Sequence, residues 1–330
     1  QAEDGIRDSS TSRGLGDVYK RQHKNPYNFI RNGTPIGKTK GYSCRIVIDE
    51  ALDWLQERQM EKQESPFFLN IWFHEPHKKM AAPDECISPY LTDGDTGVGK
   101  DSAALYSGTI DNTDRAIKEL LHYLEEQNLM EDTLIVYSSD NGSFRSDRVG
   151  VLKGKKGSNY EGGLRVPGIF CWPAKIRSGI RIEEPAGLVD LMATICDFVG
   201  YKMPEEIHLD GSSLQPLLTG DPQNFKRLQP FFWHFAESKQ IVGIRDGNYS
   251  LLAYPDYEFS KGEKFNEAWI PTIKEGGYRD FELYDLVNDP MQEDDLAKQR
   301  PELLLSLKNK LLKINASVMA EGSDWHLDSQ

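Results

Sequence analysis

One apolar run that stops at a polar turn constrains the fold of this chain more than any other stretch. Residues 134–137 read LIVY and give way at once to SSDNG at residues 138–142. That pattern is typical of a buried strand whose carboxyl end carries polar side chains. A long amphipathic helix is predicted just before it, over residues 101–127, with a buried stripe of Ile110, Ile117, Leu121 and Leu124. Helix, short turn and strand in this order favour an α/β fold with a parallel sheet flanked by helices.

Asp140 and Asn141 lie where this strand is expected to end, which is the edge of the sheet at which α/β enzymes place their chemistry. One carboxylate and one amide oxygen side by side suit Ca²⁺ or Mg²⁺. An isolated Asp-Asn-Gly is also ordinary turn chemistry, and a plain turn is the competing interpretation. The glycine-spaced segment that follows carries Lys153, Lys155 and Lys156. Because a lysine ammonium group can meet an oxyanion, the combination favours a functional site over a plain turn.

Three motifs in this region resemble the type I sulfatases of the alkaline-phosphatase-like superfamily. They are SDNG at residues 139–142, the Lys156-Gly157 pair and EGGLRVP at residues 161–167, at the spacing usual in that family. The resemblance is to arylsulfatase and N-acetylgalactosamine-6-sulfatase-type enzymes. It implies an α/β fold: an alkaline-phosphatase-like sandwich with a mostly parallel central sheet flanked by helices. A small C-terminal α+β subdomain with an antiparallel sheet is expected to follow.

The resemblance implies a role for each residue that matches a motif. Asp140 and Asn141 are expected to bind one divalent ion, the active-site Ca²⁺. Lys156, the lysine before the glycine, is expected to contact the sulfate group. Lys153 and Lys155 match no such role, and we expect both side chains to be solvated.

A second candidate segment follows residues 67–73, whose sequence FFLNIWF predicts a short strand. This run leads directly into His74-Glu75-Pro76-His77. An imidazole at the end of a strand suits acid, base or anion-binding work, because its pKa lies closest to neutrality. The resemblance implies that His77, after the proline, binds the sulfate and protonates the departing alcohol. It also implies, less firmly matched, that His74 contacts the substrate.

No nucleophile is assigned. The resembling family uses a formylglycine made from Cys or Ser within Cys/Ser-x-Pro/Ala-x-Arg, and neither Cys44, followed by RIVI, nor Cys86, followed by ISPY, fits that pattern. Residues 1–22 do not resemble any part of a sulfatase and look like a translated sequencing adapter, so we exclude them from fold reasoning and expect them to be disordered. The chain is therefore expected to be an N-terminally truncated fragment without the formylglycine segment and with little or no turnover alone.

Composition restricts the partners. The chain has 52 acidic and 39 basic residues, a net charge of −13, which argues against a general nucleic-acid surface. A sulfated substrate is anionic too, so its capture requires a local cationic pocket, which the lysine-rich loop can supply. The four cysteines are widely spaced with no CxxC and indicate neither a zinc site nor a disulfide framework. No run reaches transmembrane length, and the resemblance implies a periplasmic or secreted protein.

The chain is expected to have two domains after the leader. Residues 23–220 would form the C-terminal part of the sulfatase catalytic domain, and residues 221–330 the small subdomain, with a boundary at Gly220-Asp221-Pro222. Residues 83–100 are predicted to be a loop. Short aromatic or branched runs at 241–245, 249–254 and 281–286 predict the antiparallel sheet, and a final helix is expected from Pro301.

The sequence thus predicts a sulfuric ester hydrolase that acts on sulfated carbohydrates or aryl sulfates. Two alternatives stay open: a phosphodiesterase or phosphonate hydrolase of the same superfamily, and a non-catalytic relative that binds sulfated glycans. Extra His and Asp ligands for two transition metals would favour the phosphoester chemistry. A Cys/Ser-x-Pro-x-Arg motif upstream would favour the sulfatase.

Overall fold

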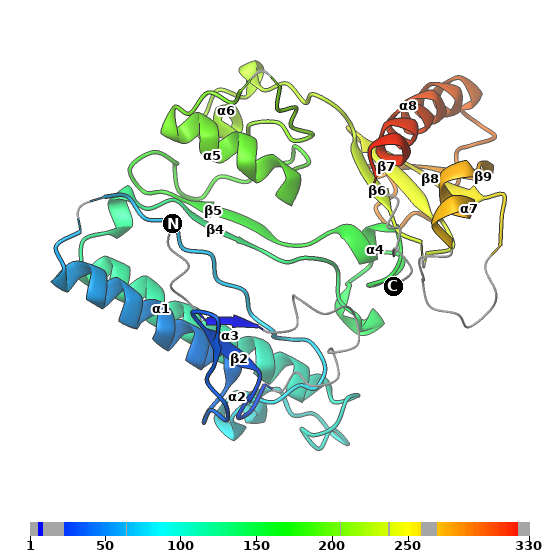
Figure 1. Cartoon of the computed structure of the whole chain (residues 1–330). Helices are drawn as coiled ribbons and strands as arrows, with labels where there is room; N and C mark the ends of the chain where they lie inside the picture. The colour runs from blue at the N-terminus through cyan, green and yellow to red at the C-terminus, as the bar shows by residue number, and fades with distance from the viewer. Residues whose placement is uncertain are drawn as a thin grey trace, which may run out of the picture. The chain divides into compact units, whose positions relative to one another are not determined.

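The computed structural model describes residues 6–8, 23–63, 65–204, 206–236, 238–258 and 269–322. The chain divides into two compact units, Gln1–Asp132 and Thr133–Gln330 (Figure 1). The predicted domain boundary at 220–222 falls inside the second unit and stays a prediction. Within the 1–22 leader, Ile6–Asp8 forms strand β1, and the leader's other residues lie outside the described residues.

The first unit is built around two long helices, α1 (Ser43–Met60) and α3 (Ala103–Glu126), and α3 is the helix that the sequence predicted over residues 101–127. Ser102 caps α3, because its hydroxyl accepts a hydrogen bond from the Leu105 N–H at 2.9 Å. Strands β1, β2 (Phe29–Arg31) and β3 (Thr34–Pro35) form a small antiparallel sheet in this unit.

The buried face of α3 differs from the predicted stripe. Leu124 is buried, but Ile110 is 42% exposed. Small and polar side chains make most of the interface instead, because neighbouring segments approach the helix closely. A Cβ on Gly108 would lie 2.9 Å from the Cys86 carbonyl oxygen. The buried residues of α3 are Ala104, Leu105, Tyr106, Gly108, Thr109, Asn112, Thr113, Ala116 and Leu124.

Part of the predicted 83–100 loop is helical. A short helix α2 (Asp84–Ile87) and a 3₁₀ turn η3 (Ser88–Tyr90) form there. Cys86 and Ile87 are buried against α3, with Ala104 and Leu105 in the same cluster. The stretch was predicted to be a loop because most of its residues are polar, although Cys86 and Ile87 are apolar and buried.

The predicted strand over 67–73 is wrong as a strand, although its side chains alternate as a strand's do. Ile71 and Phe73 pack against the cluster formed by α1 and α3, whereas Phe68 and Trp72 are 75% and 73% exposed. No ladder among the described residues includes this stretch. An apolar pattern reports which side chains are buried, but a strand also needs a backbone partner.

In the second unit, β4 (Ile135–Ser138) and β5 (Gly168–Cys171) pair antiparallel, with Ser138 opposite Gly168. All the ladders between described strands are antiparallel, so the mostly parallel sheet that the resemblance implies does not appear among them. Because Ser138 and Gly168 are paired, the two ends of the intervening segment 139–167 lie next to each other. Helix α5 (Leu191–Val199) follows η6 (Leu188–Asp190) and ends at Gly200, whose φ of 68° is the expected C-cap conformation.

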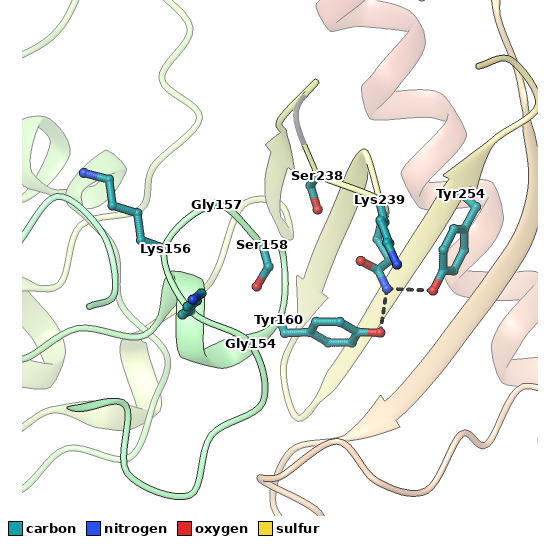
Figure 2. A pocket seen from close by; sticks show the side chains of 10 residues that line it. Gly154, Lys156, Gly157, Ser158, Tyr160, Ser238, Lys239 and Tyr254 are labelled. Carbon is teal, nitrogen blue, oxygen red and sulfur yellow. Dashed lines mark hydrogen bonds between the residues drawn. The ribbon is translucent and has the colours of Figure 1, made fainter. Parts of the chain in front are cut away.

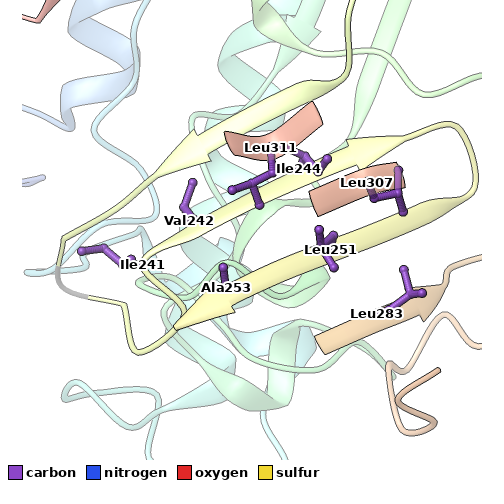
Figure 3. Close-up of a cluster of buried hydrophobic side chains, with 8 residues drawn as sticks. All are labelled: Ile241, Val242, Ile244, Leu251, Ala253, Leu283, Leu307 and Leu311. Carbon is purple, nitrogen blue, oxygen red and sulfur yellow. The ribbon is translucent and has the colours of Figure 1, made fainter. Parts of the chain in front are cut away.

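The predicted C-terminal antiparallel sheet is confirmed. It comprises β6 (Phe231–His234), β7 (Val242–Asp246), β8 (Tyr249–Pro255) and β9 (Tyr278–Asp285) in that order. Helix α8 (Pro301–Glu321) packs on it. Leu307 and Leu311 of this helix meet apolar side chains of β7, β8 and β9 in a core drawn in Figure 3. The strands of this sheet therefore pair in the order in which they occur in the sequence, and the helix that follows them packs on the sheet.

The remaining described elements are short. They are η4 (Met130–Asp132), η5 (Ser146–Arg148), α4 (Glu161–Leu164), α6 (Gln215–Leu218), η7 (Pro222–Asn224) and α7 (Ile270–Glu275). Of the helices that the structure describes, none combines the length and apolarity needed to cross a membrane.

Candidate functional site

The 139–167 segment is a loop whose two arms are joined repeatedly along their length. At its base, the Ser138 hydroxyl donates to the Pro167 carbonyl oxygen at 3.0 Å. Further out, the Gly142 N–H donates to the Gly163 carbonyl oxygen at 2.9 Å. The Lys156 N–H donates to the Ser143 carbonyl oxygen, also at 2.9 Å. These bonds hold the SDNG motif, the lysine segment and the EGG motif in one compact structure.

Glycines permit this close packing. A Cβ on Gly142 would lie 2.1 Å from the Gly162 carbonyl oxygen, and a Cβ on Gly163 would lie 2.1 Å from the Ser158 carbonyl oxygen. Real side chains cannot approach a backbone that closely. Gly157 has a φ of 92°, a conformation that side chains other than glycine rarely adopt. The spacing of glycines that carried the family resemblance therefore has a steric cause in this loop.

Asp140 and Asn141 leave β4 at its carboxyl end. Asp140 is exposed, and the Ser139 hydroxyl lies 3.4 Å from its Oδ1 and 3.3 Å from the Asn141 carbonyl oxygen. Their oxygens are the donor type that Ca²⁺ prefers, but Ca²⁺ takes roughly six to eight ligands. No group of three His, Cys, Asp or Glu side chains suited to a metal forms within the described ranges. The pair thus fits Ca²⁺ in kind and supplies part of a coordination shell.

The three lysines of the loop differ sharply. Lys155 and Lys156 are exposed, the latter beside the SDNG arm. Lys153 is half-buried, and its Nζ lies 2.9 Å from the Gln292 carbonyl oxygen and 3.3 Å from the Tyr284 hydroxyl. Its ammonium also lies 5.1 Å from the centroid of the Tyr284 ring. The expectation that Lys153 is solvated is wrong, because its partners come from residues far along the chain.

Three tyrosines and one carboxylate anchor the loop to the C-terminal sheet. The hydroxyls of Tyr160, Tyr254 and Tyr284 lie 2.7, 2.7 and 3.1 Å from the Glu282 carboxylate oxygens. Burial and then Glu282 raise the pKa of Tyr160 and Tyr254 above the ordinary value, so both hydroxyls stay protonated donors. The Lys153 ammonium lies 4.5 Å from the Tyr160 ring centroid. The lysine loop is therefore fixed at its root.

Glu161 provides a second anchor. It is 4% exposed and forms ion pairs with Arg165 at 3.1 Å and with Arg245 of β7 at 3.3 Å. Its backbone N–H donates to the Gln292 side-chain oxygen at 2.8 Å. A buried carboxylate requires such partners, which accounts for the glutamate at the start of EGGLRVP.

A pocket of about 440 Å³ borders this loop (Figure 2). The Lys156 side chain points away from Tyr160 and Tyr254, while Ser158 and Ser238 lie between the loop and the β6–β7 connection. The lining residues are Gly154, Lys155, Lys156, Gly157, Ser158, Tyr160, Ser238, Lys239, Gln240 and Tyr254.

His74 and His77 belong to the first unit, in a turn after the 67–73 stretch. The His77 N–H donates to the His74 carbonyl oxygen at 2.9 Å. Glu75 holds the turn at the N-terminus of α1, where its carboxylate accepts hydrogen bonds from the Ser43 hydroxyl and, at 3.0 Å, from the Cys44 N–H. The His74 ring stacks on Phe29 with centroids 6.1 Å apart.

The His77 ring has a defined orientation. Its Nδ1 lies 2.8 Å from the Lys78 carbonyl oxygen, so Nδ1 is the donor and Nε2 is the nitrogen that can exchange a proton. His23, which the sequence analysis passed over, is 1% exposed. Burial, with a smaller contribution from the positive charge of His77, lowers the pKa of His23 to about 4. No pattern in the sequence around His23 distinguished it from a loop residue.

The predicted site residues therefore divide between the units. Asp140, Asn141 and Lys156 share one braced loop in the second unit, and His74 and His77 lie in the first. Their convergence on one pocket stays a prediction. From the sequence, Cys171 was considered only among the four widely spaced cysteines and not as a nucleophile. It is followed by WPAK, which has the proline but not the arginine of the formylglycine motif, and it pairs with Ile135 in the β4–β5 ladder.

Two family models match the chain. One, described as sulfatase, covers residues 4–201, and a second, described as N-sulphoglucosamine sulphohydrolase, C-terminal, covers residues 155–266. Human arylsulfatase D is 34% identical over 270 residues, which is 76% of this chain and 42% of that protein. Human steryl-sulfatase is 33% identical over 204 residues, or 59% of this chain and 32% of that protein. The chain thus spans less than half the length of either relative.

Solved structures share the fold. Ps i-CgsB, solved in complex with k-i-k-neocarrahexaose, has a TM-score of 0.68 at 25% identity and covers 87% of this chain and 57% of its own. A protein in complex with its substrate D-glucosamine-2-N,6-O-disulfate has a TM-score of 0.62 at 18% identity, over 94% and 76% of the two chains. A phosphonate monoester hydrolase from Silicibacter pomeroyi has a TM-score of 0.59 at 19% identity, over 95% and 67%. The predicted alkaline-phosphatase-like α/β fold and its C-terminal antiparallel sheet are confirmed, whereas the mostly parallel sheet does not appear among the described ladders.

Proposed function

Because the chain belongs to the sulfatase family, we propose that it contributes metal-binding, sulfate-binding and proton-donating residues to a sulfuric ester hydrolase that acts on sulfated carbohydrates. One observation carries the proposal. The 139–167 loop braces the Asp-Asn pair and Lys156 against each other through the Ser143–Lys156 and Gly142–Gly163 hydrogen bonds. A loop built this way presents oxygen ligands and a cation in a fixed arrangement.

Each residue has a defined task in this proposal. Asp140 and Asn141 bind Ca²⁺, which when bound offsets negative charge on the sulfuryl oxygens. Lys156 contacts a sulfate oxygen through its exposed ammonium. His77, with Nδ1 committed to the Lys78 carbonyl oxygen, gives a proton from Nε2 to the departing alcohol. His74 contacts the substrate beside it. The nucleophile, a formylglycine in the family, is not assigned to a residue of this chain.

Sulfated sugars are the substrate class that the comparisons support best. The second family model, which covers 155–266, is that of a sulphoglucosamine sulphohydrolase C-terminal region, and one structural neighbour was solved with a disulfated glucosamine. The phosphonate monoester hydrolase neighbour supports the second candidate function, phosphonate or phosphodiester hydrolysis, at the level of the fold.

Binding of glucosamine 6-sulfate, measured by calorimetry with Ca²⁺ or with a chelator, tests the proposal. We expect Ca²⁺-dependent binding that falls about tenfold or more in Lys156→Ala, because a charge contact to an anionic oxygen is lost. Lys313→Ala, which removes an exposed lysine on α8, is the matched control and should leave the affinity unchanged. Equal affinity in wild type and Lys156→Ala contradicts the assignment, and tighter Ca²⁺-independent binding of glucosamine 6-phosphate favours the second candidate.

Turnover provides a separate test. Sulfate release from an aryl sulfate in the presence of Ca²⁺ is expected to be close to background, because no residue of this chain fits the formylglycine motif. Robust release that needs no formylglycine would show that the nucleophile lies among residues we have not assigned.

A further inference from the structure

The pocket beside the lysine loop lies outside the residues assigned above, apart from Lys156 at its edge. Among the described residues that line it, the other charged ones are Lys155 and Lys239, and none is acidic. Glu282, which lies behind two lining tyrosines, already accepts three hydroxyl hydrogen bonds. In a chain with a net charge of −13, this is a local concentration of positive charge. Such a concavity favours an anionic ligand.

Two serine hydroxyls in this pocket have no hydrogen-bond partner among the described residues. They are the Oγ atoms of Ser158, from the lysine loop, and Ser238, from the β6–β7 connection, and both atoms are buried. Ser238 is only 8% exposed. Figure 2 shows Ser158 on the lysine loop and Ser238 on the β6–β7 connection. Because buried hydroxyls in folded proteins nearly always have a partner, two unpaired ones in one pocket point to an oxygen-bearing ligand.

Hydrogen bonds join the two walls that carry these hydroxyls. Gln240, 4% exposed, donates from Nε2 to the hydroxyls of Tyr160 at 2.5 Å and Tyr254 at 2.7 Å. The Asn159 side chain, 2% exposed, donates to the Gln240 carbonyl oxygen at 2.7 Å. The loop wall and the strand wall are therefore linked directly. A pocket organised in advance loses less entropy when a ligand binds.

We propose that this pocket binds a second anionic group, a sulfate or a carboxylate, carried by the sugar unit next to the one whose sulfate Lys156 contacts. The proposal rests on the proposed function. Ser158 and Ser238 donate hydrogen bonds to the anionic oxygens, and Lys239 supplies the charge. Lys156 points away from Tyr160 and Tyr254, so its ammonium is directed to a different group. The substrate class is therefore a polyanionic glycan rather than a monosulfated sugar.

Calorimetry with three disaccharides tests this proposal. All carry one 6-sulfate, and the neighbouring sugar carries a second sulfate, a carboxylate or neither. We expect the wild-type chain to bind one or both of the doubly charged ligands about tenfold more tightly than the singly charged one. The combined Ser238→Ala and Lys239→Ala variant should reduce that preference to about twofold or less and leave the singly charged ligand unaffected. The sulfate and carboxylate arms show which anion the pocket prefers.

The control is the combined Ser306→Ala and Lys313→Ala variant, which removes the same two residue types from exposed positions on α8. It should keep the wild-type preference. Equal affinity of the wild-type chain for all three ligands, no binding of any of them, or a preference that survives Ser238→Ala with Lys239→Ala overturns the pocket proposal. A preference that depends on Lys239, together with an affinity for the singly charged ligand that Lys156→Ala does not lower, supports the pocket and contradicts the proposed function, so the two failures are distinguishable.

Discussion

Strands β7, β8 and β9 of the C-terminal sheet and residues 67–73 are all apolar runs that the sequence predicts as strands, but only the sheet acquires hydrogen-bonded neighbours. Ile244 of β7 and Leu251 of β8 are 1% and 0% exposed and face each other across a short hairpin. Phe68 and Trp72, in the other stretch, are 75% and 73% exposed, and no ladder in the described part of the chain includes them. The difference shows that an apolar run identifies a stretch with buried side chains but does not by itself make that stretch a strand. Backbone pairing requires a partner, and a hairpin supplies one locally.

The largest expected effect is in the core of the C-terminal sheet. Leu311 on α8 is fully buried against that sheet, so Leu311→Ala should lower the free energy of unfolding by about 2–5 kcal/mol. Its neighbour Leu312 is 38% exposed, and Leu312→Ala is expected to cost about 1 kcal/mol or less. Urea denaturation followed by circular dichroism measures both. Similar losses in the two variants would mean that α8 does not pack as described.

The first unit is expected to be sensitive to acid because of His23. Burial lowers its folded pKa to about 4, whereas the unfolded side chain titrates at its ordinary value of about 6.5. Between these two pH values, His23 is protonated in the unfolded state but neutral in the folded state. The free energy of unfolding is therefore highest above pH 6.5 and falls as the pH approaches 4. The loss is at most about 3 kcal/mol.

His23→Leu should flatten this pH dependence of the unfolding free energy between pH 6.5 and 4. His122→Leu is the matched control, because His122 lies on the exposed side of α3 beside Glu126. Denaturant titrations at several pH values provide the measurement. An unchanged slope in His23→Leu would show that another group is responsible.

A smaller effect is expected from the anchored lysine of the site loop. Lys153→Met removes the hydrogen bond to the Gln292 carbonyl oxygen and the cation–π contacts with Tyr160 and Tyr284, for about 1–3 kcal/mol. Lys155→Met, at an exposed position two residues away, should change the unfolding free energy by about 0.5 kcal/mol or less. Thermal melts of the two variants decide the point. Equal melting temperatures would mean that the contacts of Lys153 do not stabilise the protein, as expected for a solvated side chain.

The smallest effect should come from the exposed face of residues 67–73. Trp72→Ser is expected to change the unfolding free energy by about 0.5 kcal/mol or less, because that side chain is 73% exposed. Ile71→Ser, one residue away and packed on the core of α1 and α3, should cost about 2–4 kcal/mol. Chemical denaturation distinguishes the two. If Trp72→Ser cost as much as Ile71→Ser, the side chains of residues 67–73 would not alternate between buried and exposed positions.

Much of the fold follows from local signals in the sequence. The α3 helix, the final helix α8 and the C-terminal strands were predicted because each depends on residues close in the chain. The buried face of α3 was missed because it contains small residues such as Gly108 and Ala116. These residues allow neighbouring segments to approach the helix closely, and they do not form a stripe of large apolar side chains. The antiparallel pairing of β4 with β5 was missed because nothing in either strand specifies its partner.

The candidate site shows the same division. Glycine spacing and the SDNG motif located the loop, and hydrogen bonds from Gly142 and Lys156 join its two arms. The fate of Lys153 could not be read from the sequence, because Tyr284 and Gln292 reach it from more than a hundred residues along the chain. Whether His77 joins Lys156 around one ligand depends on two units, and the motifs indicate it only through the family resemblance.

The central proposal is that His77 and Lys156 act on the same ligand, and nuclear magnetic resonance of the histidine rings tests it most directly. The chain is titrated with glucosamine 6-sulfate in the presence of Ca²⁺ while the His77 ring protons are observed. The account predicts that the His77 signals shift on binding and that Lys156→Ala abolishes the shift. His77 signals that stay unchanged while the amides around Lys156 respond would contradict a shared site.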